Sequence, residues 1–524
     1  MRRAIRKNNG RQKVSDETQI PAPVKGWIAH GTPVNADPQT ALIMENWFPE
    51  AQEIVARSGF EAFATNVATG GVETLLSYRG GSAAKLFACG DGKIIDITSG
   101  GGFTGAAGDV SGLAEDRWYS TMFATAAGQF LVCANGGDDV RNYDGSTWTT
   151  PTITGVTSST LIYPHAHKFR LWFIQSGSTD LWFLSASSIA GAATKFSIGG
   201  LLKKGGNITA IGTWSADAGD GMDDFFVIMT SEGEVIVYQG SDPTDRDLWS
   251  MVGIYAIGKP IGRRCMERIG GDLALLTEDG IVSAALALKL DRGVISEKSI
   301  TSPIRDAFNA AVRRGADVYG WQMLVHPVRN MFILNVPGNG STATCQFVMN
   351  TTTGAWCKFA GWDARCWANY DGGIYFGRAN GRVLKADTGA RDGTRDIDLA
   401  VLPSYNHLGA RGRQKHVKMC QPIYYSDIID NPPATSIAIN YETPTEGNAV
   451  VSNTTGFFTW DVSVWDGPDV WFGGSINDAW RGSGNIGYVI SPYTTASINN
   501  EGATNQYRYS LTGWTLVYEV GGVL

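Results

Sequence analysis

The chain has 524 residues, a formal net charge of −7 at pH 7, 43% hydrophobic residues and 18% charged residues. This length exceeds what one hydrophobic core usually organises, and the negative charge excludes a general polyanion binder, so any contact with nucleic acid has to be local. The 65 glycines, together with 17 Trp, 18 Tyr and 21 Phe, indicate many short strands joined by tight turns and argue against disorder.

The first 20 residues form a basic segment with almost no apolar side chain, so by itself this segment buries too little surface to fold. Its basic residues are Arg2, Arg3, Arg6, Lys7, Arg11 and Lys13. One interpretation is a solvated tail, and the other is an arm that becomes ordered against an acidic partner or nucleic acid. Four prolines and an apolar run over 41–47 then suggest an extended strap over a core. We therefore treat residues 1–49 as an extended N-terminal arm and strap.

The stretch 131–149 carries two tight turns between short strand-like runs. An apolar run is followed by the turn Asn135-Gly136-Gly137, and a return run is followed by the turn Asp144-Gly145. Because these residue types tolerate positive φ angles, the pattern predicts a β-hairpin, with Trp148 covering one sheet face. Looser copies of this unit recur at 72–98, 118–149, 161–196, 208–240, 251–288, 319–359 and 362–388.

A period of about 40 residues made only of short strands is typical of a β-propeller, because one blade cannot cover its own two faces and blades therefore pack in a ring. We predict an all-β protein in which residues 50–400 form a β-propeller of about seven blades, with six to eight possible. One helix interrupts the strands over 301–315, where Ser302 is the expected N-cap, Pro303 the first helical residue and Gly315 the end.

From about residue 400 the blade turn disappears while strand-like runs continue, so we predict a separate C-terminal β-sandwich or barrel over residues 401–524. A basic segment with Arg411, Arg413, Lys415 and Lys418 leads into its first strand. For this segment and for Lys203-Lys204 we favour a solvated or subunit-contact surface over direct contact with DNA.

Metal and cofactor sites are not indicated. The acid-rich loop with Asp217, Asp220, Asp223 and Asp224 could hold Ca²⁺, but its spacing does not match an EF-hand and a solvated turn is the preferred interpretation. His165 and His167 would face the same side of a strand, yet no third zinc ligand is close in the sequence.

The seven cysteines contain no CxxC pair, and we expect them to be reduced and buried. No apolar stretch reaches the roughly 18 residues of a membrane span, and the N-terminus lacks the apolar part of a secretory signal.

Enzymatic activity is not indicated either. No nucleophile elbow, phosphate loop, dinucleotide fingerprint or HExxH motif occurs, and the turn at 143–148 is one residue short of a sialidase-type Asp box. We therefore expect no catalytic residues. Two acids on a propeller axis could still form a glycosidase site, which leaves a carbohydrate-binding or carbohydrate-cleaving propeller as the alternative function. A cellular scaffold propeller is disfavoured because no WD or kelch signature is present.

Six long stretches carry a resemblance to a known family. They are NWFPEAQEIVARSGF (46–60), GTWSADAGDGMDDFFVIMTSEGEVIVYQGSDP (212–243), IGRRCMERIGGDLALLTEDGIV (261–282), FVMNTTTGAWCKFAGW (347–362), GGIYFGRANGRVLKADTG (372–389) and the last run, GWTLVYEVGGVL. These stretches resemble tail hub, or nozzle, proteins of short-tailed phages, which carry a propeller and a β-sandwich.

The resemblance implies a structural virion protein of the phage tail, made in the host cytoplasm. Such subunits form a ring, usually a hexamer, below the portal and its adaptor, and the ring conducts and gates the genome. The implied partners are other copies of the chain, portal and adaptor proteins, tail fibre or tail needle or spike proteins, and viral DNA that passes without sequence-specific binding. No catalytic residue comes with the family. We expect an acidic or neutral lumen, since basic side chains that bind phosphates would retard the genome.

Overall fold

The computed structural model describes residues 15–521, apart from 82, 216–223, 288, 290–291, 428–431, 443–474, 478–479 and 500–506. The chain divides into two compact units. Unit 1 comprises Met1–Arg57, Asp396–Gly502 and Tyr507–Leu524, and unit 2 comprises Ser58–Arg395 and Ala503–Gln506. Strands dominate both units, and none of the helices among the described residues is long and apolar enough to cross a membrane.

Unit 2 contains seven main sheets in the part of the chain that the structure describes, each built largely from consecutive antiparallel strands. The first comprises β6 (Thr74–Gly80), β7 (Ala83–Gly90), β8 (Lys93–Asp96) and β10 (Val110–Ser111). The second comprises β11 (Tyr119–Thr125), β12 (Gly128–Ala134), β13 (Arg141–Tyr143) and β14 (Trp148–Thr149). The third comprises β16 (Leu161–His167), β17 (Arg170–Gln175), β18 (Asp180–Phe183) and β20 (Thr194–Ser197). A short parallel pair joins β15 (Ile153–Thr154) to β19 (Gly191–Ala192).

The remaining four sheets continue the same order. The fourth comprises β21 (Ile208–Trp214), β22 (Phe225–Thr230), β23 (Glu234–Gly240) and β24 (Trp249–Ala256). The fifth comprises β25 (Met266–Ile269), β26 (Asp272–Thr277) and β27 (Gly280–Ser283). The sixth comprises β28 (Gln322–His326), β29 (Met331–Val336), β30 (Cys345–Asn350) and β31 (Trp356–Ala360). The seventh comprises β32 (Cys366–Tyr370), β33 (Gly373–Gly377), β34 (Val383–Ala386), β5 (Phe60–Thr65) and β9 (Gly101–Gly102).

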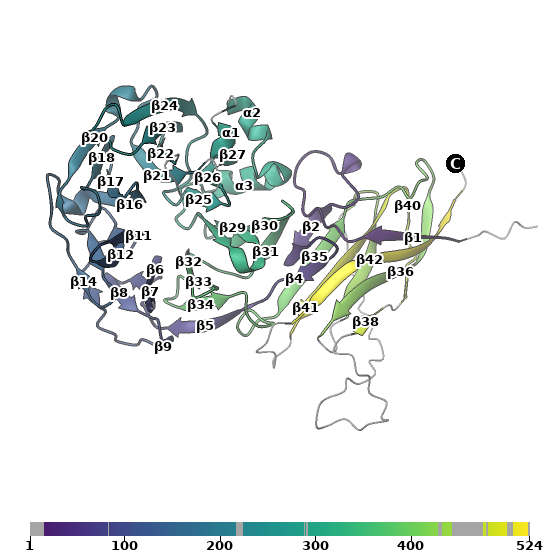
Figure 1. The fold of residues 1–524 in the computed structure, drawn as a ribbon. Helices are drawn as coiled ribbons and strands as arrows, with labels where there is room; N and C mark the ends of the chain where they lie inside the picture. Colours follow the sequence, from purple (N-terminus) through teal and green to yellow (C-terminus); the bar gives the residue numbers. More distant parts are fainter. Residues whose placement is uncertain are drawn as a thin grey trace, which may run out of the picture. The chain divides into compact units, whose positions relative to one another are not determined.

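These sheets close into a ring, which Figure 1 shows, and unit 2 is therefore a β-propeller. The first strand of each sheet contacts the first strand of the next, and β32 of the last sheet contacts β6 of the first. The ring is closed by chain connectivity as well, because β34 pairs antiparallel with β5, which comes from the beginning of unit 2. Pairing the two ends of the unit in one sheet removes the open edge at which the ring would otherwise come apart.

Aromatic side chains fill the spaces between neighbouring sheets. Between the third and fourth sheets, Trp172 and Trp249 are stacked with ring centroids 5.7 Å apart, and Trp172 lies 4.6 Å from Phe226. All three are buried. Each such ring removes roughly 150–250 Å² from water, which explains why a chain of short strands carries so many aromatic residues.

The acidic residues of the repeated turns have a structural role. Asp138 accepts hydrogen bonds from the backbone N–H groups of Ala114 and Glu115, and Asp91 accepts them from Thr69 and Gly70. In both cases the acid lies in the turn after the second strand and holds the loop that leads into the first strand of the same sheet. The pKa of Asp91 is lowered, chiefly by the backbone hydrogen bond from Thr69. In the first two sheets the turn acid therefore fixes the innermost strand to its own hairpin.

The helical region is longer than predicted. The expected helix is present as α3 (Arg305–Gly315), which buries Phe308 and Ala311, but Ser302–Ile304 form a 3-10 turn before it, η4, without a side-chain cap. Ser302 is therefore not the N-cap that the sequence suggested. Two further helices, α1 (Ala284–Ala287) and α2 (Arg292–Glu297), follow the fifth sheet. The other 3-10 turns are η1 (Pro33–Asn35), η2 (Ser158–Thr160), η3 (Gly199–Leu201) and η5 (Pro327–Arg329).

Unit 1 is built from two antiparallel groups of strands. One contains β1 (Asp16–Pro21), β3 (Trp47–Pro49), β4 (Ile54–Ala56), β36 (Lys415–Ser426), β38 (Ser475–Asn477), β39 (Arg481–Gly482), β40 (Ile486–Gly487) and β42 (Tyr509–Val520). The other contains β2 (Ala41–Glu45), β35 (Ile397–Pro403), β41 (Ile490–Ile498) and β37 (Ala434–Ile439). The fully buried Trp514 of β42 donates an Nε1–H hydrogen bond of 2.9 Å to Thr494 of β41, which ties the two groups together.

The N-terminal segment differs from the predicted arm and strap. Residues 41–49 do not cover a core from outside, because β2 and β3 are strands of unit 1. β1 pairs with β42 and β2 pairs with β35, so both lie beside strands that come hundreds of residues later in the chain. The sequence concealed this arrangement, since a short apolar run shows neither its partner nor the sequence distance to it.

No disulfide joins the seven cysteines, all of which the structure describes. Six of them are buried, and Cys345 is partly buried. The predicted buried thiols are thus seen at all positions except Cys345, where the side chain retains some exposure.

Candidate functional site

The basic residues selected from the sequence do not form one site. Arg2, Arg3, Arg6, Lys7, Arg11 and Lys13 lie outside the described residues. Arg411 and Arg413 are exposed, as a solvated surface requires.

The prediction of an exposed basic surface is wrong for Lys415, because this residue is fully buried. Its ammonium group donates hydrogen bonds to the carbonyl oxygens of Ala410 at 2.5 Å and Tyr488 at 2.7 Å. Desolvation lowers the pKa of this ammonium group. Lys415 therefore anchors the start of β36 and is not available for contact with a partner or with nucleic acid.

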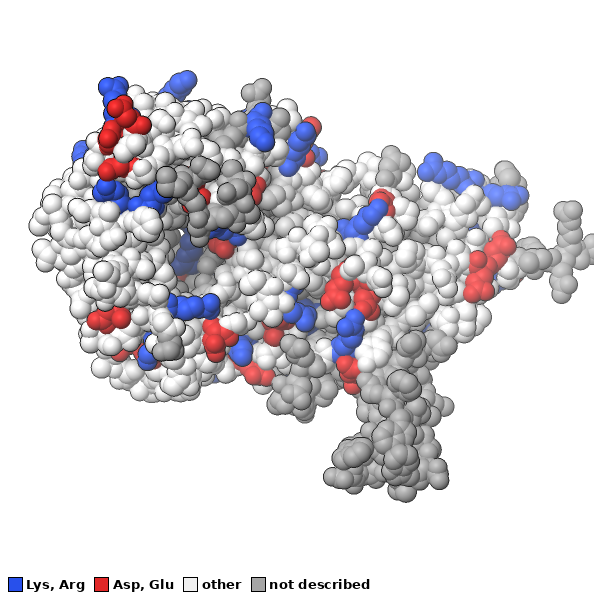
Figure 2. Space-filling model, in the orientation of Figure 1, with Lys and Arg blue, Asp and Glu red and all other residues white. Residues whose placement is uncertain are grey.

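The structure instead points to the axis of the propeller, where three adjoining cavities follow one another. We call them the chamber, of about 800 Å³, the neck, of about 270 Å³, and the vestibule, of about 420 Å³. The chamber and neck share Tyr163, His165, Met266 and Glu267, while the neck and vestibule share Tyr119 and Arg264. Figure 2 shows a hollow in the propeller, with charged side chains of both signs visible inside it.

Arg264 separates the neck from the vestibule. It precedes β25, and its guanidinium donates hydrogen bonds to Gln322 Oε1 at 3.0 Å and Thr74 Oγ1 at 3.1 Å, beside the first strands of two other sheets. The guanidinium also donates to the carbonyl oxygen of Glu73 at 3.3 Å. The ring of Tyr319 lies 5.3 Å from it and that of Tyr119 lies 6.0 Å from it, within reach of a cation–π attraction. One arginine thus joins several sheets across the axis.

Glu73 organises the neighbouring charges. Its carboxylate forms an ion pair of 2.7 Å with Arg365, and Arg117 approaches it at 3.6 Å. Arg117 also lies over the ring of Tyr319 at 4.2 Å. The carboxylate of Glu73 therefore pairs with these two arginines. Arg264 contacts Glu73 only through the backbone carbonyl.

Tyr163 reaches the axis because of a local irregularity in β16. The pairing of β16 with β17 shifts register between Ile162 and His165, and Tyr163 has φ of 53°, a left-handed conformation that is costly for an aromatic residue. Its ring stacks on Tyr119 with centroids 5.3 Å apart. The bulge therefore turns an aromatic side chain into the passage between the chamber and neck.

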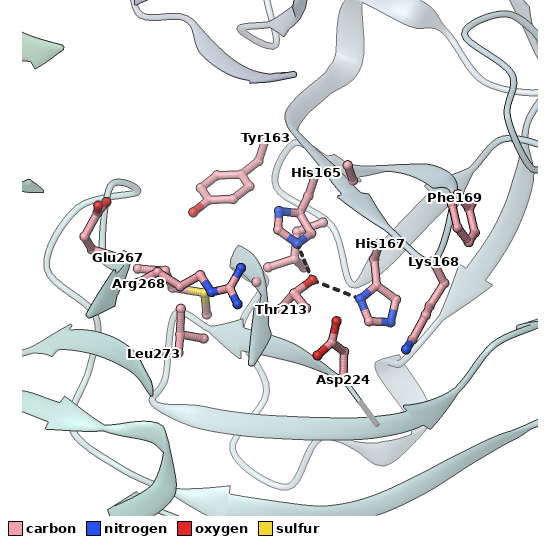
Figure 3. Close-up of a pocket in the computed structure, with 14 residues that line it drawn as sticks. Tyr163, His165, His167, Lys168, Phe169, Thr213, Asp224, Glu267, Arg268 and Leu273 are labelled. Carbon is pink, nitrogen blue, oxygen red and sulfur yellow. Dashed lines mark hydrogen bonds between the residues drawn. The ribbon is translucent and has the colours of Figure 1, made fainter. Parts of the chain in front are cut away.

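Two histidines and a threonine form the polar wall of the chamber (Figure 3). His165 Nε2 and His167 Nδ1 each lie 2.9 Å from Thr213 Oγ1, and the single hydroxyl hydrogen can be donated to only one of the two rings. Burial lowers the pKa of His165 to about 4 and that of His167 to about 3. Both rings are thus neutral at pH 7.

Two carboxyl groups also line the chamber. Burial raises the pKa of Glu267 to about 8, against the opposing effect of a backbone hydrogen bond from Val325, so Glu267 is largely protonated at neutral pH. Asp224 lies below Thr213 and His167 in Figure 3. Of the predicted acidic loop, Asp217, Asp220 and Asp223 fall outside the described residues. Among the residues described, no group of three or more His, Cys, Asp or Glu side chains is arranged to hold a metal ion.

Comparisons with known proteins give distant structural similarities to β-propeller proteins. No family model matches the chain, and no curated protein matches it significantly. The computationally designed Ika8 protein aligns at 10% identity over 69% of this chain and 98% of its own, with a TM-score of 0.34. The β-propeller domain of Cps50 (Swd1) from Myceliophteria thermophila aligns at 12% identity over 64% and 99%, with a TM-score of 0.39. BBS1N, solved in complex with ARL6DN, aligns at 11% identity over 63% and 96%, with a TM-score of 0.38.

Sequence reasoning missed most residues of the axial cavities. His165 and His167 were noticed as a pair, but Arg264, Tyr163 and Glu267 were not. A usable signal was the position of Arg264, directly before the first strand of a hairpin unit, since such positions converge on the axis of a propeller. The β-bulge that turns Tyr163 toward the axis has no comparable signal in the sequence.

Proposed function

We propose that this chain is a structural virion protein, a tail hub or nozzle subunit of a short-tailed phage, without enzymatic activity. Copies of the chain would form a ring, with six as the expected number, below the portal and adaptor proteins of the tail. The ring would conduct and gate the viral DNA and carry tail fibre or tail needle or spike proteins. The long sequence stretches that resemble this family support the proposal, together with the pairing of a propeller and an all-β second unit.

In finer detail, we propose that the seven sheets of unit 2 are seven blades and that unit 1 is a β-sandwich. The antiparallel strand groups β36–β42 and β35–β41, tied by Trp514 and Thr494, support the sandwich assignment.

The observation that supports a ring of subunits is an apolar sheet edge on unit 2. β24 ends its sheet, with only β23 as a paired neighbour, so its other edge has no strand partner in the described chain. Met251 and Val252 are each 44% exposed on β24, and Leu248 just before it is 51% exposed. Exposed apolar side chains on an open edge strand are typical of a surface that another chain covers.

The test combines native mass measurement with negative-stain imaging of the purified chain, alone and mixed with the portal and adaptor of the same virus. A six-fold ring in either sample supports the proposal. The Val252→Lys variant should lose the ring, because a charge on the open edge opposes burial against a neighbour. Val294→Lys is the matched control, since Val294 is 42% exposed on α2. Monomers in both samples would contradict the ring.

The carbohydrate-binding or carbohydrate-cleaving propeller is the second candidate. The chamber favours it, because a cavity of about 800 Å³ with aromatic and acidic side chains is of the size that holds a small ligand. Release of sugar from an oligosaccharide by monomers of the chain would favour this candidate, whereas a ring without such activity would favour the tail hub.

A further inference from the structure

Arg264 is a charged group with unused hydrogen-bonding capacity. A guanidinium has five N–H donors, and three of those of Arg264 are used by Gln322, Thr74 and the carbonyl of Glu73. All three acceptors are uncharged, and no carboxylate of the described residues lies within 4.0 Å of this guanidinium in an ion pair. Two donors therefore remain at the point where the neck meets the vestibule.

The charges around the chamber also favour an anion. Lys168 and Arg268 line it together with the acids Asp224 and Glu267. Because Glu267 is largely protonated and both histidines are neutral, the described wall carries more positive than negative charge at pH 7. Arg264 adds a further positive charge at the end of the neck.

The remaining surface is suited to a hydroxylated ring. Ile211, Leu273 and Met266 supply apolar wall, while His165 and Thr213 offer polar atoms within the same cavity. At the edge of the chamber, Phe169 is 79% exposed and has φ of 59°, directly after Lys168 with φ of 47°. Two successive non-glycine residues in the left-handed region are strained, and this turn presents an aromatic face beside the cavity.

We propose that the chamber and neck bind a carboxylate-bearing sugar, whose carboxylate is held by Arg264 and whose hydroxyl groups face His165 and Thr213. Planar guanidinium donors match a carboxylate well, and the faces of Tyr163 and Phe169 can pack on the apolar side of a sugar ring. A phosphate ester would normally need several cations converging on it or a nest of backbone N–H groups, whereas among the described residues that line the neck Arg264 is the single Lys or Arg. The site does not depend on ring formation, so it would serve the tail hub as well as the alternative function.

The experiment measures binding to the full-length chain by ligand-observed NMR and titration calorimetry. The probes are sodium glucuronate, glucose as its uncharged match, and inorganic phosphate. We expect glucuronate to bind at least about tenfold more tightly than glucose, because a charge-assisted hydrogen bond contributes that much. Equal binding of glucose and glucuronate, or binding of phosphate alone, would overturn the assignment of a carboxylate.

Variants locate the site. Arg264→Gln should weaken glucuronate binding at least about tenfold and leave glucose binding nearly unchanged. Arg263→Gln, which alters the vestibule alone, should change neither.

Because Arg264→Gln could also loosen the ring of sheets, a second variant leaves that residue in place. Met266→Trp should block the passage from chamber to neck and abolish binding, while Met419→Trp makes the same exchange at an exposed position of β36 in unit 1 and should have no effect. Glucuronate binding that survives both Arg264→Gln and Met266→Trp would show that the ligand binds elsewhere.

Discussion

The two units are built in opposite ways. In unit 2, each sheet consists mostly of strands that follow one another along the chain, and among the described strands of the seven sheets only β5 and β9 join a sheet from a distance. In unit 1, β42 pairs with β1, so that Trp514 lies opposite Ile20, and β35 pairs with β2. Short-range pairing closes small loops at low entropic cost, whereas the strands of unit 1 meet only after nearly the whole chain is available. Unit 2 should therefore be the more autonomous of the two.

The largest expected effect comes from separating the units. A chain of residues 58–395 should fold by itself with a cooperative thermal transition, because it contains all seven sheets. A chain of residues 396–524 should not fold, because β42 and β35 would lack β1, β4 and β2. Circular dichroism and thermal melting provide the measurement. Fusing residues 1–57 to residues 396–524 through a flexible linker should restore folding, and a folded 396–524 fragment would refute the contrast.

The second effect is a loss of stability on acidification that comes from two histidines of unit 2. His165 and His167 have folded-state pKa values of about 4 and about 3, below the ordinary value of 6.5. Above pH 6.5 a histidine with a lowered folded-state pKa is neutral in both states and costs nothing, whereas between pH 6.5 and the folded-state value the unfolded chain binds a proton that the folded chain does not, so stability is lost as the pH falls. By pH 5 each histidine should have cost about 2 kcal/mol. Denaturant unfolding of wild type and of the His165→Gln, His167→Gln double variant at pH 7.5 and 5 should show a smaller pH dependence in the variant. Equal dependence in both would mean that other groups control it.

The third effect concerns unit 1. Lys415→Met should lower the free energy of unfolding of unit 1 by about 1–3 kcal/mol, because it leaves the buried carbonyls of Ala410 and Tyr488 without their donor. Arg411→Met and Arg413→Met should stay within about 0.5 kcal/mol, since both side chains are exposed. The measurement is denaturant unfolding of the three variants. A similar, small cost at all three positions would return Lys415 to the surface cluster predicted from the sequence.

The smallest effect tests the turn acids of unit 2. Asp138→Ala should cost about 0.5–2 kcal/mol, because the N–H groups of Ala114 and Glu115 lose the acceptor that holds the entering loop. Asp139→Ala changes the neighbouring acid, which is exposed, and should be close to neutral. Thermal unfolding of the two variants gives the comparison. Equal shifts in melting temperature would show that Asp138 does not stabilise the entering loop.

Much of unit 2 was predictable because its signals are local. The turns at Asn135-Gly136 and Asp144-Gly145 join β12, β13 and β14 as the hairpin pattern predicted, and Gly136 and Gly145 have positive φ. Helix α3 also lies where its proline, apolar spacing and glycine placed it. The acids of the repeated turns were seen as part of a pattern, but their hydrogen bonds to entering loops needed the fold.

The candidate site was far less predictable. His165 and His167 form a visible pair in the sequence, yet their neutral state depends on burial and on Thr213, which lies 46 residues beyond His167. Arg264 resembles any other arginine until the first strands of several sheets converge around it. Lys415 was misjudged for the same reason, since a basic run does not reveal which of its side chains points inward.

By itself, the sequence determined the local structure of this protein: short strands, glycine and acid turns, one amphipathic helix and buried thiols. These follow from φ preferences, alternation and side-chain size, which act over a few residues. The tertiary structure alone decided which distant strands pair, as with β1 and β42, and which side chains meet on the axis. Such contacts arise from the closure of a ring and the packing of sheets, where burial and charge depend on residues hundreds of positions apart.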